Sequence, residues 1–75
     1  MSYTFRIILR PEPEGGYTVL VPALPGCVTY GETVEEAERM AQDAIAGCIA
    51  VMREEGEEIP DDSLVLEKNI QVAVA

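Results

Sequence analysis

The chain has no histidine, only two cysteines and only five basic residues among its 75 residues. Without histidine, the commonest general acid-base catalyst is missing, and no metal site that depends on imidazole ligands can be completed. Cys27 and Cys48 are too far apart in sequence for a Cys-x-x-Cys pair, so we interpret both as small buried apolar residues. Because histidine is absent and the cysteines are not paired, we expect no metal, and we expect no cofactor. Neither a signal-peptide pattern nor a long apolar run is present, so we expect a cytoplasmic protein.

The charge is strongly acidic and unevenly distributed. Between residues 32 and 62, eleven acidic residues face only Arg39 and Arg53, which accounts for the whole net charge of −9. Residues 1–31 and residues 63–75 each sum to zero. A field of this sign repels phosphate backbones and attracts a basic partner, so we expect no direct nucleic-acid binding. The alternative interpretation of the acidic segment is a solubilising helix face.

The first half of the chain predicts a meander of three antiparallel strands. Residues 3–10 alternate apolar and polar side chains, the segment from Pro11 to Gly16 concentrates turn formers, and residues 17–21 are rich in β-branched residues. The segment Pro22-Ala23-Leu24-Pro25-Gly26 reads as a stiff turn because two prolines fix φ and glycine tolerates positive φ. Residues 27–30 then predict a third, short strand.

A long amphipathic helix follows this meander. Thr33 and Glu36 form a capping-box pattern, and apolar residues recur at three- and four-residue spacing as far as Met52. Gly56 predicts the end of the helix, and Gly47 inside it predicts a close approach of the helix to the sheet.

The last residues resume a strand-like alternation, which predicts a fourth strand and the order β-β-β-α-β. The fold class is therefore α+β, a small antiparallel sheet covered by one long helix, in a single domain over residues 1–75. A 75-residue domain buries only about 60% of its unfolded surface, so we expect at least a dimer. The fourth strand is expected at the sheet edge, where it would form an oligomer seam through Ile70, Val72 and Val74.

Several sequence pieces together resemble the HicB family of antitoxins. They are Tyr17, then Pro22-x-Leu24-Pro25-Gly26-Cys27, then Gly31-x-Thr33-x-Glu35-Glu36-Ala37, then Ala44-Ile45, then Gly56-Glu57-x-Ile59-Pro60. The resemblance implies a truncated ribonuclease-H-like core. It also implies that the protein binds and inhibits HicA, a small basic toxin that cleaves mRNA with a catalytic histidine. The expected partners are thus a HicA-like toxin and further copies of this chain.

The chain departs from the family pattern in two places. Many family members have an aspartate where this chain has Ala23, so any polar contact of that aspartate is missing here. Many also continue into a C-terminal DNA-binding module, whereas too few residues follow Pro60 for a helix-turn-helix. We therefore expect no C-terminal DNA-binding domain and no direct operator binding.

The candidate partner-binding residues are acidic or aromatic, and each has a structural alternative. They are Glu12, Glu14, Tyr17, Tyr30, Glu35, Glu38 and Asp43. The two tyrosines could anchor an interface, or they could simply pack within the strands. The two hairpin glutamates could enter a cationic groove of a partner, or they could belong to a solvated turn. Leu24 and Cys27 could belong to a loop that a partner binds. The interpretation that we favour is a turn that places both side chains in the core.

Two other function classes compete with the antitoxin. A metal-dependent nuclease needs several carboxylates converging on Mg²⁺, usually from strands, and the three N-terminal strands contain no aspartate or glutamate. We therefore predict no enzyme activity. The other class is an orphan homo-oligomeric binding module that has no toxin partner.

Overall fold

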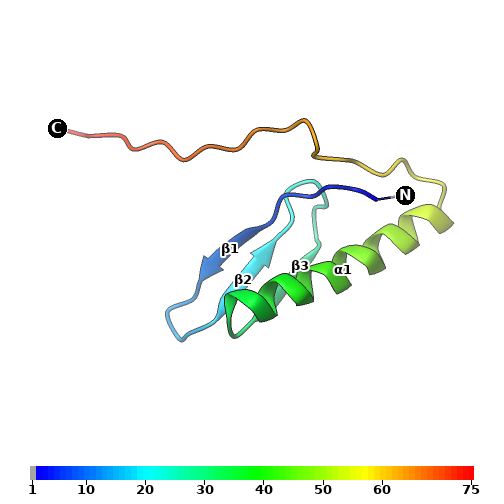
Figure 1. Ribbon diagram of the computed structural model, residues 1–75, viewed down its shortest axis with the longest axis horizontal. Helices are drawn as coiled ribbons and strands as arrows, with labels where there is room; N and C mark the ends of the chain where they lie inside the picture. The colour runs from blue at the N-terminus through cyan, green and yellow to red at the C-terminus, as the bar shows by residue number, and fades with distance from the viewer. Residues whose placement is uncertain (1) are drawn as a thin grey trace.

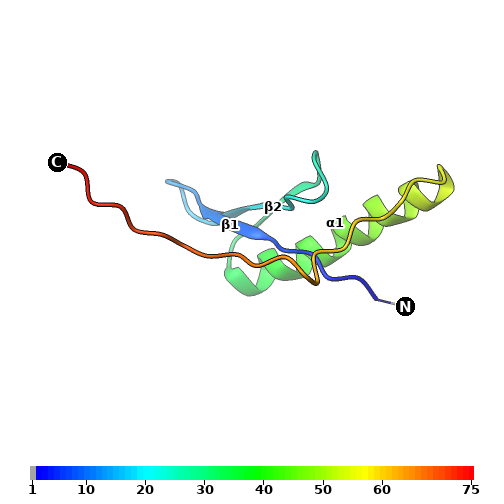
Figure 2. The same ribbon diagram turned by 90° about the horizontal axis from the view of Figure 1, so that it is seen from above.

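Three short strands form one antiparallel sheet, and a single long helix covers it. The computed structural model describes residues 2–75, with strands β1 (Ile8–Pro11), β2 (Tyr17–Leu20) and β3 (Val28–Gly31) and helix α1 (Val34–Glu54). The strand order is β1-β2-β3, and α1 lies across one face of the sheet as a second layer (Figure 1, Figure 2). The predicted α+β architecture of a small antiparallel sheet under one long helix is confirmed.

The core lies between the sheet and the helix. Leu9, Val19 and Thr29 are cross-strand neighbours, and Val19 is fully buried with Ala37 and Ala41 of α1. A second buried cluster joins Val21, Leu24 and Cys27 to the C-terminal half of α1, where Ala44, Ile45, Cys48 and Met52 pack against it. In the first cluster α1 contributes only alanines, whereas in the second it also contributes the larger Ile45 and Met52.

The first strand is shorter than the sequence alternation predicts. Pairing begins at Ile8 opposite Leu20, although the alternating pattern starts at Tyr3. The reason is that β2 ends at Leu20 and turns at once, with the Leu24 amide donating to the Val21 carbonyl at 3.0 Å. Residues before Ile8 therefore lack a β2 partner, yet Phe5 and Ile7 still pack against the core.

Both ends of α1 are closed by the residues that the sequence indicates. The Thr33 hydroxyl accepts a hydrogen bond from the Glu36 amide at 3.1 Å, and the Glu36 carboxylate accepts one from the Glu32 amide at 2.7 Å, one residue before the cap. At the other end, Gly56 has a φ of +72° and its amide donates to the Arg53 carbonyl, while the Glu57 amide donates to the Met52 carbonyl. This pair of bonds is a Schellman motif.

The close approach between helix and sheet lies at Gly31 and not at Gly47. A Cβ atom added at Gly47 would meet nothing within 4 Å, so the prediction for this glycine is wrong. A Cβ atom at Gly31, in contrast, would overlap the backbone nitrogen and Cα of Ala37 in the first turn of α1. The chain passes from β3 into the helix through only Glu32 and Thr33, and this short connection forces the contact.

The predicted fourth strand is not formed in the single chain. Residues 57–75 contain no helix and no strand, and Ile70, Val72 and Val74 are all at least 75% exposed. A hydrogen bond of 2.9 Å from the Val65 amide to the Asp62 carbonyl turns the chain just before this segment. The segment then runs away from the sheet and ends beyond the β1-β2 hairpin (Figure 1, Figure 2). Residues 70–74 therefore have no neighbouring strand with which to form ladder hydrogen bonds.

Candidate functional site

The Pro22–Cys27 turn is built as the sequence predicts, with its apolar side chains inside. The Cys27 amide donates to the Leu24 carbonyl at 2.9 Å, and Gly26 has a φ of +88°. Leu24 and Cys27 are each only 5% exposed, whereas Pro22, Pro25 and Gly26 face solvent. The motif therefore holds the core together with two side chains and presents its backbone and prolines to the outside.

A groove lies between this turn and the C-terminal half of α1, and we call it the turn groove. It has a volume of about 620 Å³. Apolar residues from both sides form its floor, and three carboxylates stand at its rim: Ala23, Leu24, Pro25, Ala44, Val51 and Met52, with Asp43, Glu55 and Glu57. An apolar floor with an acidic rim suits a partner segment that carries both apolar and basic side chains.

Two neighbouring carboxylates, Glu55 and Glu57, stand at the end of this groove. The pKa of Glu57 is raised above its ordinary value by a side-chain hydrogen bond and charge repulsion with Glu55 and by partial desolvation. A raised carboxyl pKa means that two negative charges here disfavour one another. A cation from a partner would relieve that repulsion, so this rim is a favourable place for a lysine or arginine.

The acidic residues of α1 extend the negative surface around both sides of the helix. Glu35, Glu38 and Asp43 are all exposed. Asp43 stands at the rim of the turn groove, whereas Glu38 lines a second groove on the other side of α1. The three carboxylates predicted as partner contacts are thus all exposed on α1, but they do not line the same groove.

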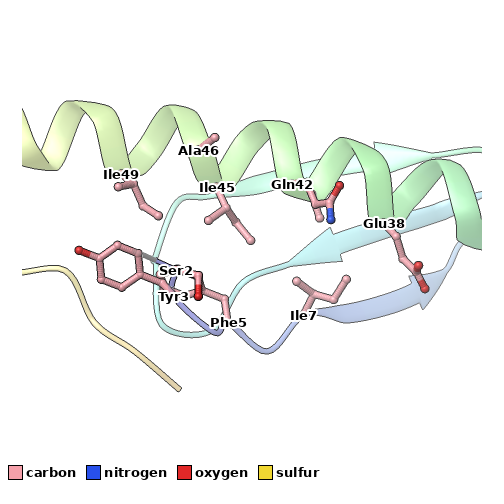
Figure 3. Close-up of a pocket in the computed structure, with 10 residues that line it drawn as sticks. Ser2, Tyr3, Phe5, Ile7, Glu38, Gln42, Ile45, Ala46 and Ile49 are labelled. Carbon is pink, nitrogen blue, oxygen red and sulfur yellow. The ribbon is translucent and has the colours of Figure 1, made fainter. Parts of the chain in front are cut away.

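The second groove lies between α1 and the N-terminal segment, and we call it the edge groove. Figure 3 shows Ile7 and Tyr3 from the N-terminal segment facing Ile45 and Ile49 from α1 across this space. Its volume is about 480 Å³, and Glu38 and Gln42 are the polar side chains that α1 contributes. This groove is less acidic than the turn groove because its lining contains a single carboxylate.

The structure separates the remaining predicted contacts. Tyr17 points inward and packs against the Val19 cluster, whereas Tyr30 is 41% exposed on the outer face and donates from its hydroxyl to the Gly15 carbonyl at 3.0 Å. Glu12 accepts a 2.6 Å hydrogen bond from the Thr18 hydroxyl, and Glu14 is exposed in the hairpin turn. The tyrosines therefore do not share a surface, and Glu12 has a structural role within the hairpin.

The other family-motif residues form the junction between β3 and α1. Gly31 gives room to Ala37, Thr33 caps the helix, and Glu36 closes the capping loop. None of these three side chains lines either groove. They position the acidic helix and do not themselves form a binding surface.

Cys27 and Cys48 meet in the core as free thiols. Cys27 is buried, and Cys48 packs against its cluster from α1. Burial, a hydrogen bond with the Cys48 side chain and the Cys48 charge together raise the pKa of the Cys27 thiol to about 11. A thiol with so high a pKa is a poor nucleophile at neutral pH, so Cys27 acts as a packing residue. Across residues 2–75 no group of three or more cysteine, aspartate or glutamate residues is arranged to hold a metal ion.

The sequence of the chain matches a known family. Residues 5–73 match the family model described as HicB_like antitoxin of bacterial toxin-antitoxin system. The chain belongs to the HicB-like antitoxin family. The description of this family places its members in bacterial toxin-antitoxin systems.

Relatives of the HicB-like chain fall into a short and a long group. A UPF0150 protein of Thermoplasma acidophilum is 41% identical over 63 residues, which are 84% of this chain and 88% of that protein. A UPF0150 protein of Synechocystis is 32% identical over 65 residues, which are 87% of this chain and 82% of that protein. The antitoxin HicB of Escherichia coli K12 is 41% identical over 56 residues, which are 75% of this chain but only 41% of that protein.

Two features of this HicB-like protein are absent from the sequence-based predictions. Asp62 is 7% exposed and accepts a 3.0 Å hydrogen bond from the Arg6 amide, while the Arg6 Nε lies 3.4 Å from its Oδ2. The outer sheet face also carries a cross-strand row of Ile8, Leu20 and Val28, in which Ile8 and Val28 are exposed and Leu20 is half-buried. Alternation in the three strands contains the signal for this row, whereas nothing in the acidic run 54–62 distinguishes Asp62.

The helix itself is too polar to cross a membrane. Although α1 spans 21 residues, neither it nor any other helical stretch among residues 2–75 combines the length and the apolar character of a membrane span. Its charged side chains are instead available at the surface described above.

Proposed function

We propose that this HicB-like protein binds a small basic HicA-like toxin that cleaves mRNA and inhibits it by covering its active surface. The observation that carries the proposal is the placement of the whole net charge of −9 on residues 32–62, which include α1 and the whole acidic rim of the turn groove. An enzyme that cleaves RNA presents cationic groups to phosphates, and clustered carboxylates can occupy those groups instead.

Inhibition of this kind needs no chemistry on the antitoxin. We propose that the apolar floor of the turn groove supplies contact area, while Asp43, Glu55 and Glu57 at its rim select a basic partner. Glu35 and Glu38 would steer the partner during association, since both are exposed on α1. The protein would act in the cytoplasm as a homo-oligomer, without catalysis and without binding DNA itself, because its field repels phosphates.

The direct test is recovery and inhibition of the toxin. The tagged full chain is used to capture partners from its native cytoplasm, the captured proteins are identified by mass spectrometry, and the partner is assayed for RNA cleavage with and without this chain. Recovery of a small basic ribonuclease that this chain silences would support the proposal. A capture that contains only the chain itself would favour the orphan oligomeric module.

The electrostatic part has a separate test with a matched control. In the variant with Glu35, Glu38 and Asp43 all changed to Lys, association with the toxin should slow at least about tenfold at low salt and lose most of its salt dependence. The control Glu35→Asp, Glu38→Asp and Asp43→Glu keeps every charge and should associate like the parent. Circular dichroism checks that both variants fold. Equal association rates for the parent and the lysine variant would remove the electrostatic steering.

A further inference from the structure

The tail of this protein exposes an apolar strand pattern with no partner. Ile70, Val72 and Val74 are between 75% and 88% exposed, and they alternate with Gln71 and Ala73. The tail also enlarges the molecule: its radius of gyration is 14.4 Å, compared with about 11 Å for a compact chain of this length. Exposure of aliphatic side chains to water is unfavourable in free energy. An alternating segment of this kind is available to pair with the edge of a sheet.

The outer edge of β1 is a matching unpaired edge. The Thr4 amide donates to Asp61 Oδ1 at 2.8 Å, the Thr4 carbonyl accepts from the Asp62 amide at 2.8 Å, and the Arg6 amide donates to Asp62 Oδ2. Within β1 the even-numbered residues bond to β2, since Pro11 has no amide to give Tyr17 and the Glu12 amide donates to the Gly16 carbonyl at 3.0 Å. Because the direction alternates along a strand, the backbone groups of Ile7 and Leu9 turn outward and remain unpaired. Among residues 2–75, no hydrogen bond joins another segment to this edge beyond Arg6.

The edge groove lies beside this open edge. A strand added next to β1 would place every second side chain beside Ile7, on the side that faces Ile45 of α1. The groove volume of about 480 Å³ is roughly three times that of a cavity that holds one benzene-sized group. It therefore has room for roughly three aliphatic side chains, which is the number that the tail alternation offers.

The chain's own tail is directed away from this edge. The turn from Asp62 to Val65 is held by its 2.9 Å hydrogen bond and by the attachment of Asp62 to Arg6. Beyond the contact of Glu67 with Arg6 at 3.2 Å, the tail leaves the sheet in both views (Figure 1, Figure 2). Each copy thus has one unpaired tail segment and one unpaired sheet edge. The tail of a second copy can pair with this edge, and the edge of the second copy can pair with this tail.

The charge distribution favours a second copy at this place and not elsewhere. Two copies of an acidic chain repel each other wherever residues 32–62 face one another, whereas residues 1–31 and 63–75 are each neutral overall. The segment 70–75 carries no charged side chain, and the edge groove contains one carboxylate, Glu38. The turn groove, with three carboxylates at its rim, stays free for a basic partner.

We propose that two copies of this protein exchange their tails, so that residues 70–74 of each copy form a strand on the β1 edge of the other. Ile70, Val72 and Val74 then fill the edge groove of the second copy, and the Asp62–Val65 turn acts as the hinge. Reciprocal exchange about a two-fold axis closes the assembly as a dimer. This inference does not rest on the proposed toxin partner, and its test requires none.

Sedimentation velocity of the full chain and two variants is the first test. The parent should sediment as a dimer, and Val72→Lys should raise the dissociation constant about tenfold for each tail, hence about a hundredfold for the dimer. The control Ala73→Lys places the same charge on the opposite side of the strand and should leave the dimer intact. A parent that is monomeric at all concentrations, or equal effects of the two lysines, would overturn the proposal.

A second measurement separates exchange from folding of the tail onto its own edge. In a mixture of isotope-labelled and unlabelled copies, nuclear Overhauser contacts between Val72 methyl groups and Ile7 should occur between copies. Contacts found only within one copy would show that the tail closes its own sheet, and tail exchange would be rejected.

Discussion

Replacement of Gly31 by alanine should destabilise the fold, because the added methyl group has no space. It would overlap the backbone nitrogen and Cα of Ala37 and lie 2.9 Å from the carbonyl carbon of Glu36. These are backbone atoms of the first helical turn, so the helix start must move. Overpacking of this kind costs about 1–3 kcal/mol, and the immobile neighbours place Gly31→Ala near the upper value.

The net change in stability follows from two opposing terms. Loss of glycine flexibility in the unfolded chain stabilises the folded state by about 0.4–1 kcal/mol, which leaves about 2 kcal/mol of destabilisation. For a domain of this size, each 1 kcal/mol shifts Tm by about 4–8 °C. Gly31→Ala should therefore melt about 8–16 °C below the parent chain.

The same substitution at Gly47 is a matched control with the opposite sign. Gly47 is exposed in the middle of α1, and a Cβ atom there would meet nothing within 4 Å. Alanine is favoured over glycine inside a helix by about 0.8–1.0 kcal/mol, so Gly47→Ala should melt about 4–8 °C above the parent.

Thermal melts followed by far-ultraviolet circular dichroism compare the three proteins. All must be measured at one protein concentration, because association makes Tm depend on concentration. A Gly31→Ala protein that melts within 1 or 2 °C (roughly the size of a surface effect) of the parent would refute the close approach of β3 to α1. A lower Tm for Gly47→Ala would refute the open position assigned to that glycine.

Two further changes test the helix cap and the core thiol. Thr33→Ala removes the hydroxyl that accepts from the Glu36 amide, so Tm should fall by about 4–8 °C, for a loss of about 1 kcal/mol, whereas Thr33→Ser should retain most of the stability; equal melting of the two variants would contradict the capping role. Burial raises the pKa of Cys27 from 9.0 to about 11, so the folded state favours the neutral thiol. The resulting contribution to the free energy of unfolding is complete below pH 9 and is lost as pH rises through 11. Urea unfolding of the parent should therefore show a stability loss between these pH values that is smaller in Cys27→Ala, and identical pH profiles would show that Cys27 is not the titrating group.

The elements that local chemistry specifies could be predicted from the sequence. Local residue patterns located β2 and β3 to within one residue, although they started β1 too early. Thr33, Glu36 and Gly56 marked the helix ends because caps depend on side chains and glycine at fixed offsets. The inward placement of Leu24 and Cys27 also followed from the stiff turn. These signals lie within a few residues of the structures that they determine.

Features that depend on distant segments could not be predicted in this way. The start of β1 depends on where β2 turns, and the site of close approach depends on how α1 crosses the sheet, which placed the glycine contact at Gly31 and not Gly47. The fourth strand required an edge that the chain's own turn at Asp62 moves out of reach. The acidic charge of the candidate site could be predicted from the sequence. The shape of the two grooves could not, because they form only when α1 packs against the rest of the chain.

The bare outer face of the sheet has a consequence for how this fold can grow. The helix covers one face only, and Ile8, Leu20 and Val28 on the other take no part in the two core clusters. Additional residues can rest on this face without repacking anything beneath the helix. In relatives such as the Escherichia coli antitoxin HicB, where the matching segment is 41% of the length, the same core must coexist with a much longer chain. A sheet covered on a single side is a module that tolerates such extension, since its interior is complete before anything is added.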